Sequence, residues 1–474
     1  MTDGSTFDPH SLPAGCAKAR RVSVRAAFVS SLALIASAVG GAAASERSAS
    51  ASLRTSDVLA LADRFGRPSG SLPDASQLGV KKVLAYEEHR AFVYVMGEGP
   101  SLVRRVVFLK PGTLVVDDQV RGPGSRWLLA SRGRPDVEGR KVRITEGGAG
   151  ILCETLLPEK AAVKARPQDG GGEVAHLVEV VPPAGEDPVR FLHVLRVGDG
   201  KDASPPKCEL ASGNGAVTLK VAAGDRTLAL TLPPGCDDAG TIAVSGADGK
   251  ALLPKRLLPA GIMPHGEEGV RLLERWDRAY HDNRRPGWDV GRPATELKKA
   301  VEEGTIRPGR AVVLGCGTGT NAIYLAQKGF DVTGIDVAPT GLAQAEAKAR
   351  KAGVRVRWLV ADVLAPPKLE PFDFLFDRGC YHHVRRVNAA GFVDMARRLS
   401  RGGSRFLILA ASANETRRGG PPRVKESEIR GDFSELFDFQ HLREIRFDTR
   451  DPKRQSVLAW SILLRRKDEK GSVK

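Results

Sequence analysis

Three glycines and an acid stand at a spacing that could hold a nucleotide-like ligand. Gly315, Gly317 and Gly319 lie in the stretch VVLGCGTGTNAIYLAQKGFDVTGID, residues 312–336. Glycine lets the backbone approach a ligand closely and adopt a positive φ, which a Cβ would hinder. Asp336 ends the next apolar run, where its carboxylate can accept two hydrogen bonds from ribose hydroxyls. The stretch therefore predicts a site for an adenosine-containing cofactor.

Two cofactor classes compete for this loop. Nicotinamide enzymes use the pattern G-x-G-x-x-G/A at a helix N-terminus. If the pattern is counted from Gly315, its last position is Thr320, which is neither glycine nor alanine. If it is counted from Gly317, its last position is Ala322, which fits, but the pattern then starts two residues beyond the strand end. The glycine loop alone therefore does not separate the two classes.

Further acids follow the later strands. The stretch VRWLVADVL ends at Asp362 and Val363, where an acid can receive an adenine amino group. The stretch FDFLFDRGCYHHV carries Asp377 toward the carboxyl ends of the strands, where ligands of open α/β sheets bind. Two closing strands, EIRFDT and VLAWSILLRR, have no evident use in a dehydrogenase. These downstream features argue against a nicotinamide cofactor.

The elements that must position these residues alternate between helix and strand from Glu274 onward. The pattern predicts strands over Arg310–Leu314 and Phe330–Asp336 and helices over Thr320–Gln327, Pro339–Lys351 and Asn388–Ser400. This order indicates a parallel sheet that is covered on both faces.

Together the motifs resemble a class I S-adenosylmethionine-dependent methyltransferase. The resemblance is closest to the small-molecule group of thiopurine, thiol and tellurite-resistance methyltransferases. It covers about residues 276–466 and includes WDRAYHDNRRPGWDVGRPATEL, the glycine stretch, ADVLAPP, FDFLFDRGCYHHV, GGSRFLILA and GPPRVKESEIR. It implies S-adenosyl-L-methionine as the cofactor.

The resemblance also implies roles for individual residues. The three glycines would pack under the amino-acid end of the cofactor, and Asp336 would hold the ribose. Asp362 and Val363 would meet the adenine, and Asp377 would lie near the sulfonium and amino groups. For Asp336 and Asp362 the alternative is helix capping or turn formation.

Aromatic residues precede the sheet, where the family folds an N-terminal segment over the cofactor. Trp276, Gly287 and Trp288 occupy this segment. An aromatic face beside a sulfonium gains cation–π attraction, which makes Trp288 a candidate cofactor contact. Ordinary packing is the alternative.

Catalytic candidates follow the fourth strand. Methyl transfer from a sulfonium mainly requires alignment of the acceptor, so a thiol or other soft acceptor needs no strong base. A hydroxyl or amine acceptor needs one, and Tyr381, His382 and His383 are the candidates. Adjacent histidines do not easily face one pocket, so one would act or both would only shape its wall. The run DRGC at 377–380 lacks the Pro-Pro-aromatic sequence of DNA amino-methyltransferases, which favours a small-molecule acceptor.

An earlier part of the chain has a different texture. Between residues 79 and 250, short alternating runs are separated by Gly, Pro and Asp turns, which predicts an all-β sandwich. The stretches RRVVFLKPGTLVVDDQVRG, ILCETLLPEKA and VRFLHVLRVGDG resemble the β-sandwich of heparinase II/III-type polysaccharide lyases. That family's helical toroid, which carries most of its catalytic residues, has no counterpart in this sequence. The resemblance therefore suggests a polysaccharide ligand and does not imply lyase activity.

The predicted organisation is multidomain. A basic KARRVSVR precedes the uncharged residues 26–44, which is typical of a secretory signal or a membrane anchor. We expect this leader at 1–44, a linker with one short helix at 45–78 and the all-β sandwich at 79–250. A linker at 251–271, an α/β Rossmann-like methyltransferase fold at 272–466 and a disordered tail at 467–474 would follow. The leader favours export or membrane attachment and the cofactor favours the cytoplasm, so the location stays open.

Composition narrows the partners. A formal charge of +16 permits an acidic partner, yet the arginines are scattered and aromatic residues make up only 5%, so nucleic acid is not expected. The six cysteines show no metal-ligand spacing, and no metal is expected. Cys153, Cys208 and Cys236 could supply one disulfide or remain buried thiols.

Two functions are compatible with the sequence. One is a methyltransferase that acts on a small molecule. The other is a secreted or surface carbohydrate-binding β-sandwich protein with a degenerate methyltransferase domain. The retained glycines and acids favour the first, because a decayed site would have lost some of them.

Overall fold

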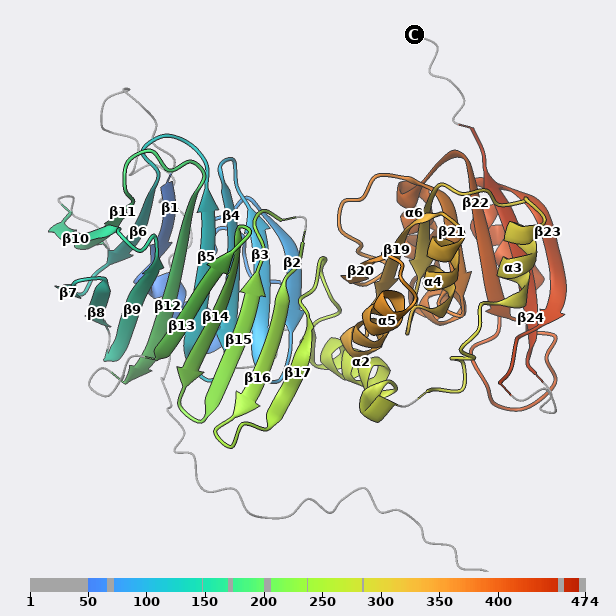
Figure 1. Cartoon of the computed structure of the whole chain (residues 1–474), viewed down its shortest axis with the longest axis horizontal. Helices are drawn as coiled ribbons and strands as arrows, with labels where there is room; N and C mark the ends of the chain where they lie inside the picture. The colour runs from blue at the N-terminus through green and yellow to red at the C-terminus, as the bar shows by residue number, and fades with distance from the viewer. Residues whose placement is uncertain are drawn as a thin grey trace, which may run out of the picture. The chain divides into compact units, whose positions relative to one another are not determined.

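The computed structural model describes residues 50–65, 72–146, 148–168, 174–199, 206–236, 238–283, 285–450 and 456–468 (Figure 1). Within these ranges no helix combines the length and the apolar character that crossing a membrane requires. The predicted leader at 1–44 and nearly all of the predicted tail lie outside these ranges, so both stay predictions.

The N-terminal region is built from three sheets. The first has the order β1 (Ser50–Arg54), β6 (Arg126–Ser131), β11 (His176–Val181) and β10 (Ala162–Pro167). The second has the order β2 (Lys82–Glu88), β3 (Phe92–Glu98), β4 (Leu102–Leu109), β5 (Thr113–Val120), β12 (Val189–Asp199), β9 (Ala149–Leu157), β8 (Lys141–Glu146) and β7 (Asp136–Glu138). The third is the meander β13 (Lys207–Gly213), β14 (Ala216–Ala223), β15 (Arg226–Leu232), β16 (Thr241–Gly246) and β17 (Ala251–Leu257). Helix α1 (Thr55–Phe65) lies where the short helix was expected.

The second sheet is buried on both faces. Along β4, Val106 packs in an apolar cluster with Trp127 of the first sheet, and Val107 packs in another cluster with Leu228 of the third. Because successive side chains of a strand point to opposite faces, the three sheets lie in layers with the second in the middle. The strand-rich character is confirmed, but the layers number three where a sandwich has two. The resemblance to a heparinase-type sandwich stays a prediction.

Charged pairs are buried in this middle sheet. The guanidinium of Arg104 donates to both carboxylate oxygens of Asp118, at 2.7 and 2.6 Å, and the Trp127 indole donates to Asp118 Oδ2 at 2.9 Å. On the opposite face Asp117 accepts from Arg105 at 3.0 Å and from Arg190 at 2.7 and 2.9 Å. Each buried charge therefore has a partner, as burial requires.

The C-terminal region contains one seven-stranded sheet. Its order is β20 (Arg357–Val360), β19 (Asp331–Asp336), β18 (Arg310–Leu314), β21 (Phe372–Arg378), β22 (Ser400–Ala411), β24 (Leu458–Arg466) and β23 (Phe437–Arg446). The first five are parallel, and β24 runs antiparallel to both of its neighbours. The strand order reverses between β18 and β21, which is where open α/β sheets bind ligands.

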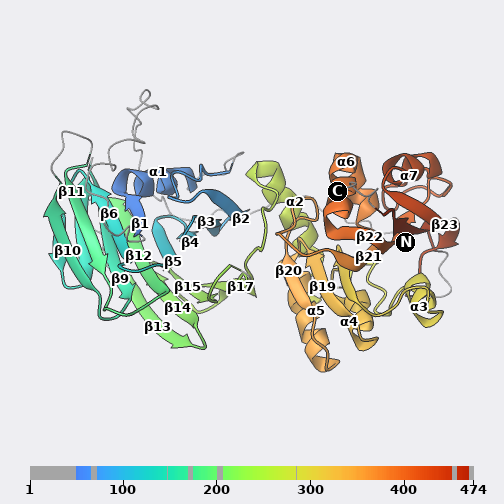
Figure 2. The same cartoon turned by 90° about the horizontal axis from the view of Figure 1, so that it is seen from above.

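Helices cover both faces of this sheet. Figure 2 shows α3 (Thr295–Glu302), α4 (Thr320–Gln327) and α5 (Pro339–Lys351) on one face. It shows α6 (Tyr381–Leu399) and α7 (Glu426–Phe433) on the other. Helix α2 (Gly266–Arg278) and the short helix η1 (His281–Asn283) precede the sheet. The predicted Rossmann-like fold is confirmed, and the predicted bounds of β18, α4 and α5 agree with the structure.

Helix α6 differs from its prediction. It begins at Tyr381 and not at Asn388, so Tyr381, His382 and His383 form its first turn. Asn388 interrupts the helical geometry with φ −154° and ψ 85°, and its side chain accepts the N–H of Gly391 at 2.8 Å. The apolar periodicity is interrupted at this kink, so the sequence predicts only the part of the helix that follows Asn388.

The segment 251–271 is not a simple linker. It contributes β17 at the edge of the third sheet and the first turns of α2. The sequence pattern of a strand is weak here because Leu253 is the only buried residue of β17. Pro254 lies in the same strand, and proline is accepted mainly in the edge strands of sheets. The five described cysteines are free, so Cys153, Cys208 and Cys236 form no disulfide.

Candidate active site

The glycine loop between β18 and α4 has a backbone that only glycine adopts easily. Gly315, Gly317 and Gly319 have φ values of 58°, 53° and 78°. A Cβ on Gly315 would lie 2.8 Å from Cβ of Cys380, and one on Gly319 would lie 2.5 Å from the Trp358 ring. Both the positive φ and the close neighbours therefore require glycine at these positions.

Asp336 closes the loop from the tip of β19. Its Oδ2 accepts the N–H of Gly317 at 2.7 Å and its Oδ1 accepts the N–H of Ala338 at 2.8 Å. Burial raises the pKa of this carboxyl to about 6, although the N–H groups of Ala338 and Gly317 act in the opposite direction. A carboxylate has about four acceptor positions, so beside the N–H groups of Gly317, Ala338 and Val337 one remains for a hydroxyl donor. The turn-forming role and the ligand-binding role are thus compatible in this residue.

Asp362 and Val363 follow β20. Asp362 is half-buried and its Oδ1 accepts the N–H of Leu364 at 2.9 Å, which forms a local turn. Its Oδ2 has no recorded donor among the described residues and can accept an amino group. Val363 is nearly buried in the apolar cluster that contains Leu359.

Asp377 is fully buried at the end of β21. Its carboxylate accepts the N–H groups of Cys380 at 3.2 Å and Tyr381 at 2.9 Å, so it caps the start of α6. Burial raises its pKa to about 7, against the opposing effect of these N–H groups. The structure thus gives Asp377 a positioning role, and its predicted contact with the sulfonium stays a prediction.

Cys380 lies among the carboxylates of the site. Its pKa is raised well above the ordinary value, first by burial and then by the charges of Asp377, Asp336 and Asp362. A thiol in such surroundings stays protonated and is a poor nucleophile. The charges that act on Cys380 thus come from acids that follow three different strands.

Tyr381 and His382 hold the structure together. Tyr381 is fully buried and its hydroxyl donates to Asp432 of α7 at 2.6 Å. His382 Nδ1 accepts the N–H of Ala411 at 3.1 Å, and its pKa is lowered to about 3 by burial and by the charges of His383 and Arg378. Both side chains are thus engaged within the fold, and the catalytic roles predicted for Tyr381, His382 and His383 stay predictions.

His383 belongs to an aromatic group that also contains Trp276 and Trp288. Its ring meets Trp276 edge-on at 5.0 Å, and Trp276 meets Trp288 edge-on at 6.0 Å. Trp288 remains 49% exposed, so it offers an open aromatic face. The pKa of His383 is lowered by burial and by the charges of Arg275 and Arg386. His383 therefore accepts a proton less readily than an ordinary histidine.

The segment before the sheet contributes residues that the sequence analysis missed. The Tyr280 hydroxyl would lie 2.9 Å from a Cβ on Gly317, and it accepts the N–H of the Trp288 indole at 3.2 Å. Asp277 accepts the backbone N–H and the hydroxyl of Thr340 at 2.7 and 2.8 Å, so it caps α5 from outside. Tyr280 follows Trp276 by one helical turn, and that spacing could have indicated a shared face.

A second link fastens the same segment to the glycine loop. The hydroxyl of Thr318 donates to Asp289 at 2.7 Å, and Lys348 lies 3.7 Å from the same carboxylate. Arg378 donates to the carbonyl of Trp288 at 2.9 Å. Residues 277–283 and 285–289 are thereby held beside the glycine loop and the end of β21.

This arrangement fits an adenosine-containing cofactor. The glycine loop offers a tight backbone turn, and Asp336 and Asp362 keep free acceptor positions on adjacent strand tips. Trp276 and Trp288 supply aromatic faces beside the loop. Among the described residues no group of three His, Cys, Asp or Glu side chains is arranged to hold a metal.

Comparison with known proteins agrees with this geometry. Residues 311–403 match the family described as a methyltransferase domain. The chain is 29% identical over 150 residues to a 2-heptyl-1-hydroxyquinolin-4(1H)-one methyltransferase of Mycobacteroides abscessus, over 31% of this chain and 66% of that protein. It is 27% identical over 149 residues to a probable thiol methyltransferase 2 of Arabidopsis thaliana, over 31% and 65%. The chain thus spans just under two thirds of the length of these relatives.

A solved structure adds a further likeness. The N-methyltransferase NodS of Bradyrhizobium japonicum, in complex with S-adenosylhomocysteine, is 18% identical, with 41% of this chain and 97% of that chain covered and a TM-score of 0.34. The glycine loop, Asp336, Asp362 and Asp377 all lie within the matched residues 311–403. Residues 311–403 therefore carry a methyltransferase domain of the class I type, and its cofactor is S-adenosyl-L-methionine.

Proposed function

We propose that this protein transfers a methyl group from S-adenosylmethionine to a small-molecule acceptor, which is a thiol or another soft nucleophile. When bound, the cofactor supplies an electrophilic methyl group on a positively charged sulfur. The names of the relatives support a small acceptor, since one methylates a hydroxyquinolone and another is a thiol methyltransferase.

The chain's own residues would bind the cofactor, orient it and shield it from water. Asp336 and Asp362 would accept hydrogen bonds from the nucleoside, and the glycine loop would lie against its amino-acid end. The segments 277–283 and 285–289 would exclude water, because Asp277 ties the first to α5 and Asp289 ties the second to Thr318. Orientation and exclusion of water are the main requirements of such a displacement.

The observation that carries the preference for a soft acceptor is the state of His383. Its pKa is lowered by burial and by Arg275 and Arg386, so it takes up a proton poorly. An acceptor that ionises near neutral pH needs no such base, and the two arginines would stabilise its negative charge. A simple alcohol or an amide would find no strong base here.

The test has two steps on the full chain. A thermal-shift titration with S-adenosylhomocysteine should raise the melting temperature, since ligand at about 100 times its dissociation constant adds roughly 2.7 kcal/mol. Methyl transfer is then measured with a series of thiols and alcohols of graded pKa, and we expect product from the more acidic thiols. Activity confined to alcohols would contradict the soft-acceptor proposal.

A negative first step would favour the second function. If millimolar S-adenosylhomocysteine produced no shift, the methyltransferase proposal would fail. Retention of the protein on an immobilised acidic polysaccharide would then support the carbohydrate-binding alternative. The three retained glycines and two acids in one crevice favour the enzyme.

A further inference from the structure

A concavity of about 710 Å³ lies on the methyltransferase region, and none of the predicted cofactor residues lines it. It is formed by the loop 304–308 that follows α3, by the first residues of β21, and by parts of β22, β23 and β24. The cofactor residues follow the carboxyl ends of β18 to β21, whereas Asp373 and Phe374 stand at the amino end of β21. The concavity therefore lies toward the amino ends of the parallel strands, whereas the cofactor residues lie at their carboxyl ends.

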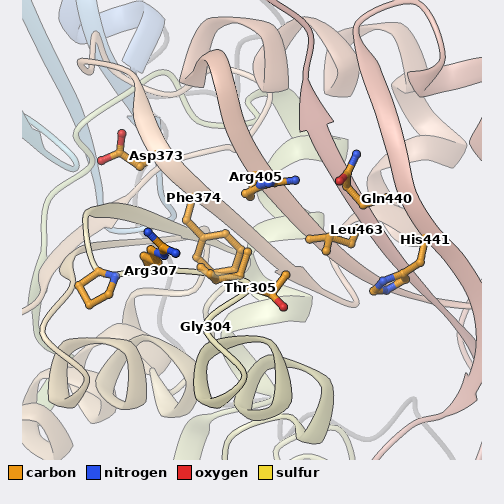
Figure 3. Close-up of a pocket in the computed structure, with 11 residues that line it drawn as sticks. Gly304, Thr305, Arg307, Asp373, Phe374, Arg405, Gln440, His441 and Leu463 are labelled. Carbon is orange, nitrogen blue, oxygen red and sulfur yellow. The ribbon is translucent and has the colours of Figure 1, made fainter.

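Figure 3 shows how its side chains are distributed. Phe374 and Leu463 lie in the middle, with Arg307 toward one end, His441 toward the other, and Arg405 and Gln440 along one side. Phe374 is only 1% exposed and Leu463 is buried, so both act as a floor. The groups that can reach a ligand are thus mainly donors.

Positive charge in the concavity is not balanced by the surrounding protein. No ion pair or hydrogen bond to the guanidinium groups of Arg307 and Arg405 is recorded among the described residues. The strand register places Arg405 directly opposite Arg465, a like-charge pair that destabilises a sheet. Arg465 forms an ion pair with Asp468 at 3.1 Å. Among the described residues no carboxylate forms an ion pair with Arg405.

The acid that lines the concavity is already engaged. Asp373 accepts the backbone N–H of Arg310 at 2.9 Å and forms an ion pair with Arg401. It is therefore not available to neutralise Arg307 and Arg405. An anion supplied from outside would relieve the repulsion between Arg405 and Arg465.

We propose that this concavity is a second binding site, for a small polyanion with phosphate or carboxylate groups. A guanidinium binds such groups through two parallel hydrogen bonds. The Gln440 amide and the Thr305 hydroxyl add neutral donors, and the volume lies within the range of about 300–1,000 Å³ of known ligand pockets. The buried Phe374 offers no open face for a base to stack on, which argues against a nucleic-acid strand.

The test uses the full chain and isothermal titration calorimetry with inorganic pyrophosphate and, separately, citrate. We expect saturable binding of at least one probe, weakened by added salt. Arg405→Gln and Arg307→Gln should each weaken binding at least tenfold, because a hydrogen bond to a charged group is worth about 1.5–3 kcal/mol. Arg405→Lys keeps the charge but not the fork, so it should give an intermediate affinity.

Controls separate this site from the cofactor site. Arg418→Gln removes an equal charge from an exposed loop beyond the other end of β22 and should not alter pyrophosphate or citrate binding. Saturating S-adenosylhomocysteine should not compete with either probe. The proposal is overturned if neither probe binds saturably, if Arg405→Gln binds like the wild type with an unchanged melting temperature, or if S-adenosylhomocysteine displaces the probe. None of these results depends on the methyl acceptor.

Discussion

At the scale of single residues, Asp336 is the group on which cofactor binding depends most. Asp336→Asn keeps the shape but replaces a charged acceptor by a neutral amide. Because hydrogen bonds to charged groups contribute about 1.5–3 kcal/mol, we expect the affinity for S-adenosylhomocysteine to fall at least tenfold in calorimetry. Asp331→Asn, at the exposed start of the same strand, is the matched control and should bind normally.

The raised pKa of Asp336 predicts a pH dependence. The ionised carboxylate is the acceptor, and its pKa is raised to about 6 by burial. Affinity for S-adenosylhomocysteine should therefore be highest above pH 7 and fall roughly tenfold between pH 7 and pH 5 as the group protonates. Asp336→Asn should reduce this dependence, and any part that remains would come from Asp362 or Asp377, whose pKa values are also raised by burial. An affinity that is constant from pH 7 to pH 5 in the wild type would contradict the assignment.

His382 and His383 should respond differently to substitution. His382→Ala leaves the buried N–H of Ala411 unpaired, which costs about 1–3 kcal/mol in the free energy of unfolding measured with urea. His383→Gln should leave stability nearly unchanged. It should also reduce kcat for a thiol by less than about tenfold, since a general base contributes about 100-fold or more. A larger loss would show that His383 acts as the base.

At the scale of elements, the junction of β18 and α4 depends on Gly319. Gly319→Ala meets both a positive φ and the rings of Trp358, so it should destabilise the protein and weaken binding of S-adenosylhomocysteine. Gly329→Ala, just beyond the other end of α4, has a φ of 86° but no atom within 4 Å of its Cβ. It should cost only about 1–2 kcal/mol and leave binding intact. Equal effects of both changes on unfolding and binding would contradict the role of Gly319.

The same junction explains how a capping residue can come from another helix. Ala338 precedes α5 and has no side-chain acceptor, so the first turn depends on Asp277 of α2. Such a cap can contribute about 1 kcal/mol. The contact couples the covering segment to the cofactor strands, which gives that segment a fixed place beside the glycine loop.

At the scale of the whole molecule, we expect the buried ion pairs of the three-layer region to stabilise that region without affecting the cofactor site. Asp118→Ala leaves the buried guanidinium of Arg104 without its carboxylate, and breaking a buried pair costs about 3–5 kcal/mol. We expect an earlier urea transition, reported by fluorescence of the buried Trp127, and unchanged affinity for S-adenosylhomocysteine. Glu209→Ala removes the exposed pair with Lys220 and should cost less than about 1 kcal/mol.

Much of the cofactor site was predictable because its parts are close in the chain. The strand β18, the glycine loop, α4 and β19 follow one another within residues 310–336, and each has a local signal of apolar spacing or glycine. The hydrogen bond between Gly317 and Asp336 joins residues within that one unit. Local periodicity therefore predicted the type of fold and an adenosine-containing ligand, whereas S-adenosylmethionine was implied by the downstream motifs and the resemblance to class I methyltransferases.

The contacts between segments that are far apart in the chain were decided only by the tertiary structure. The different surroundings of His382 and His383 depend on which side of α6 meets Ala411 and which meets Trp276. The number of layers in the β region depended on both faces of the middle sheet finding partners, and the paired arginines of β22 and β24 became neighbours only through strand register. A sequence records the period of an element but not the partner of each face, because that partner is chosen by packing between residues far apart in the chain.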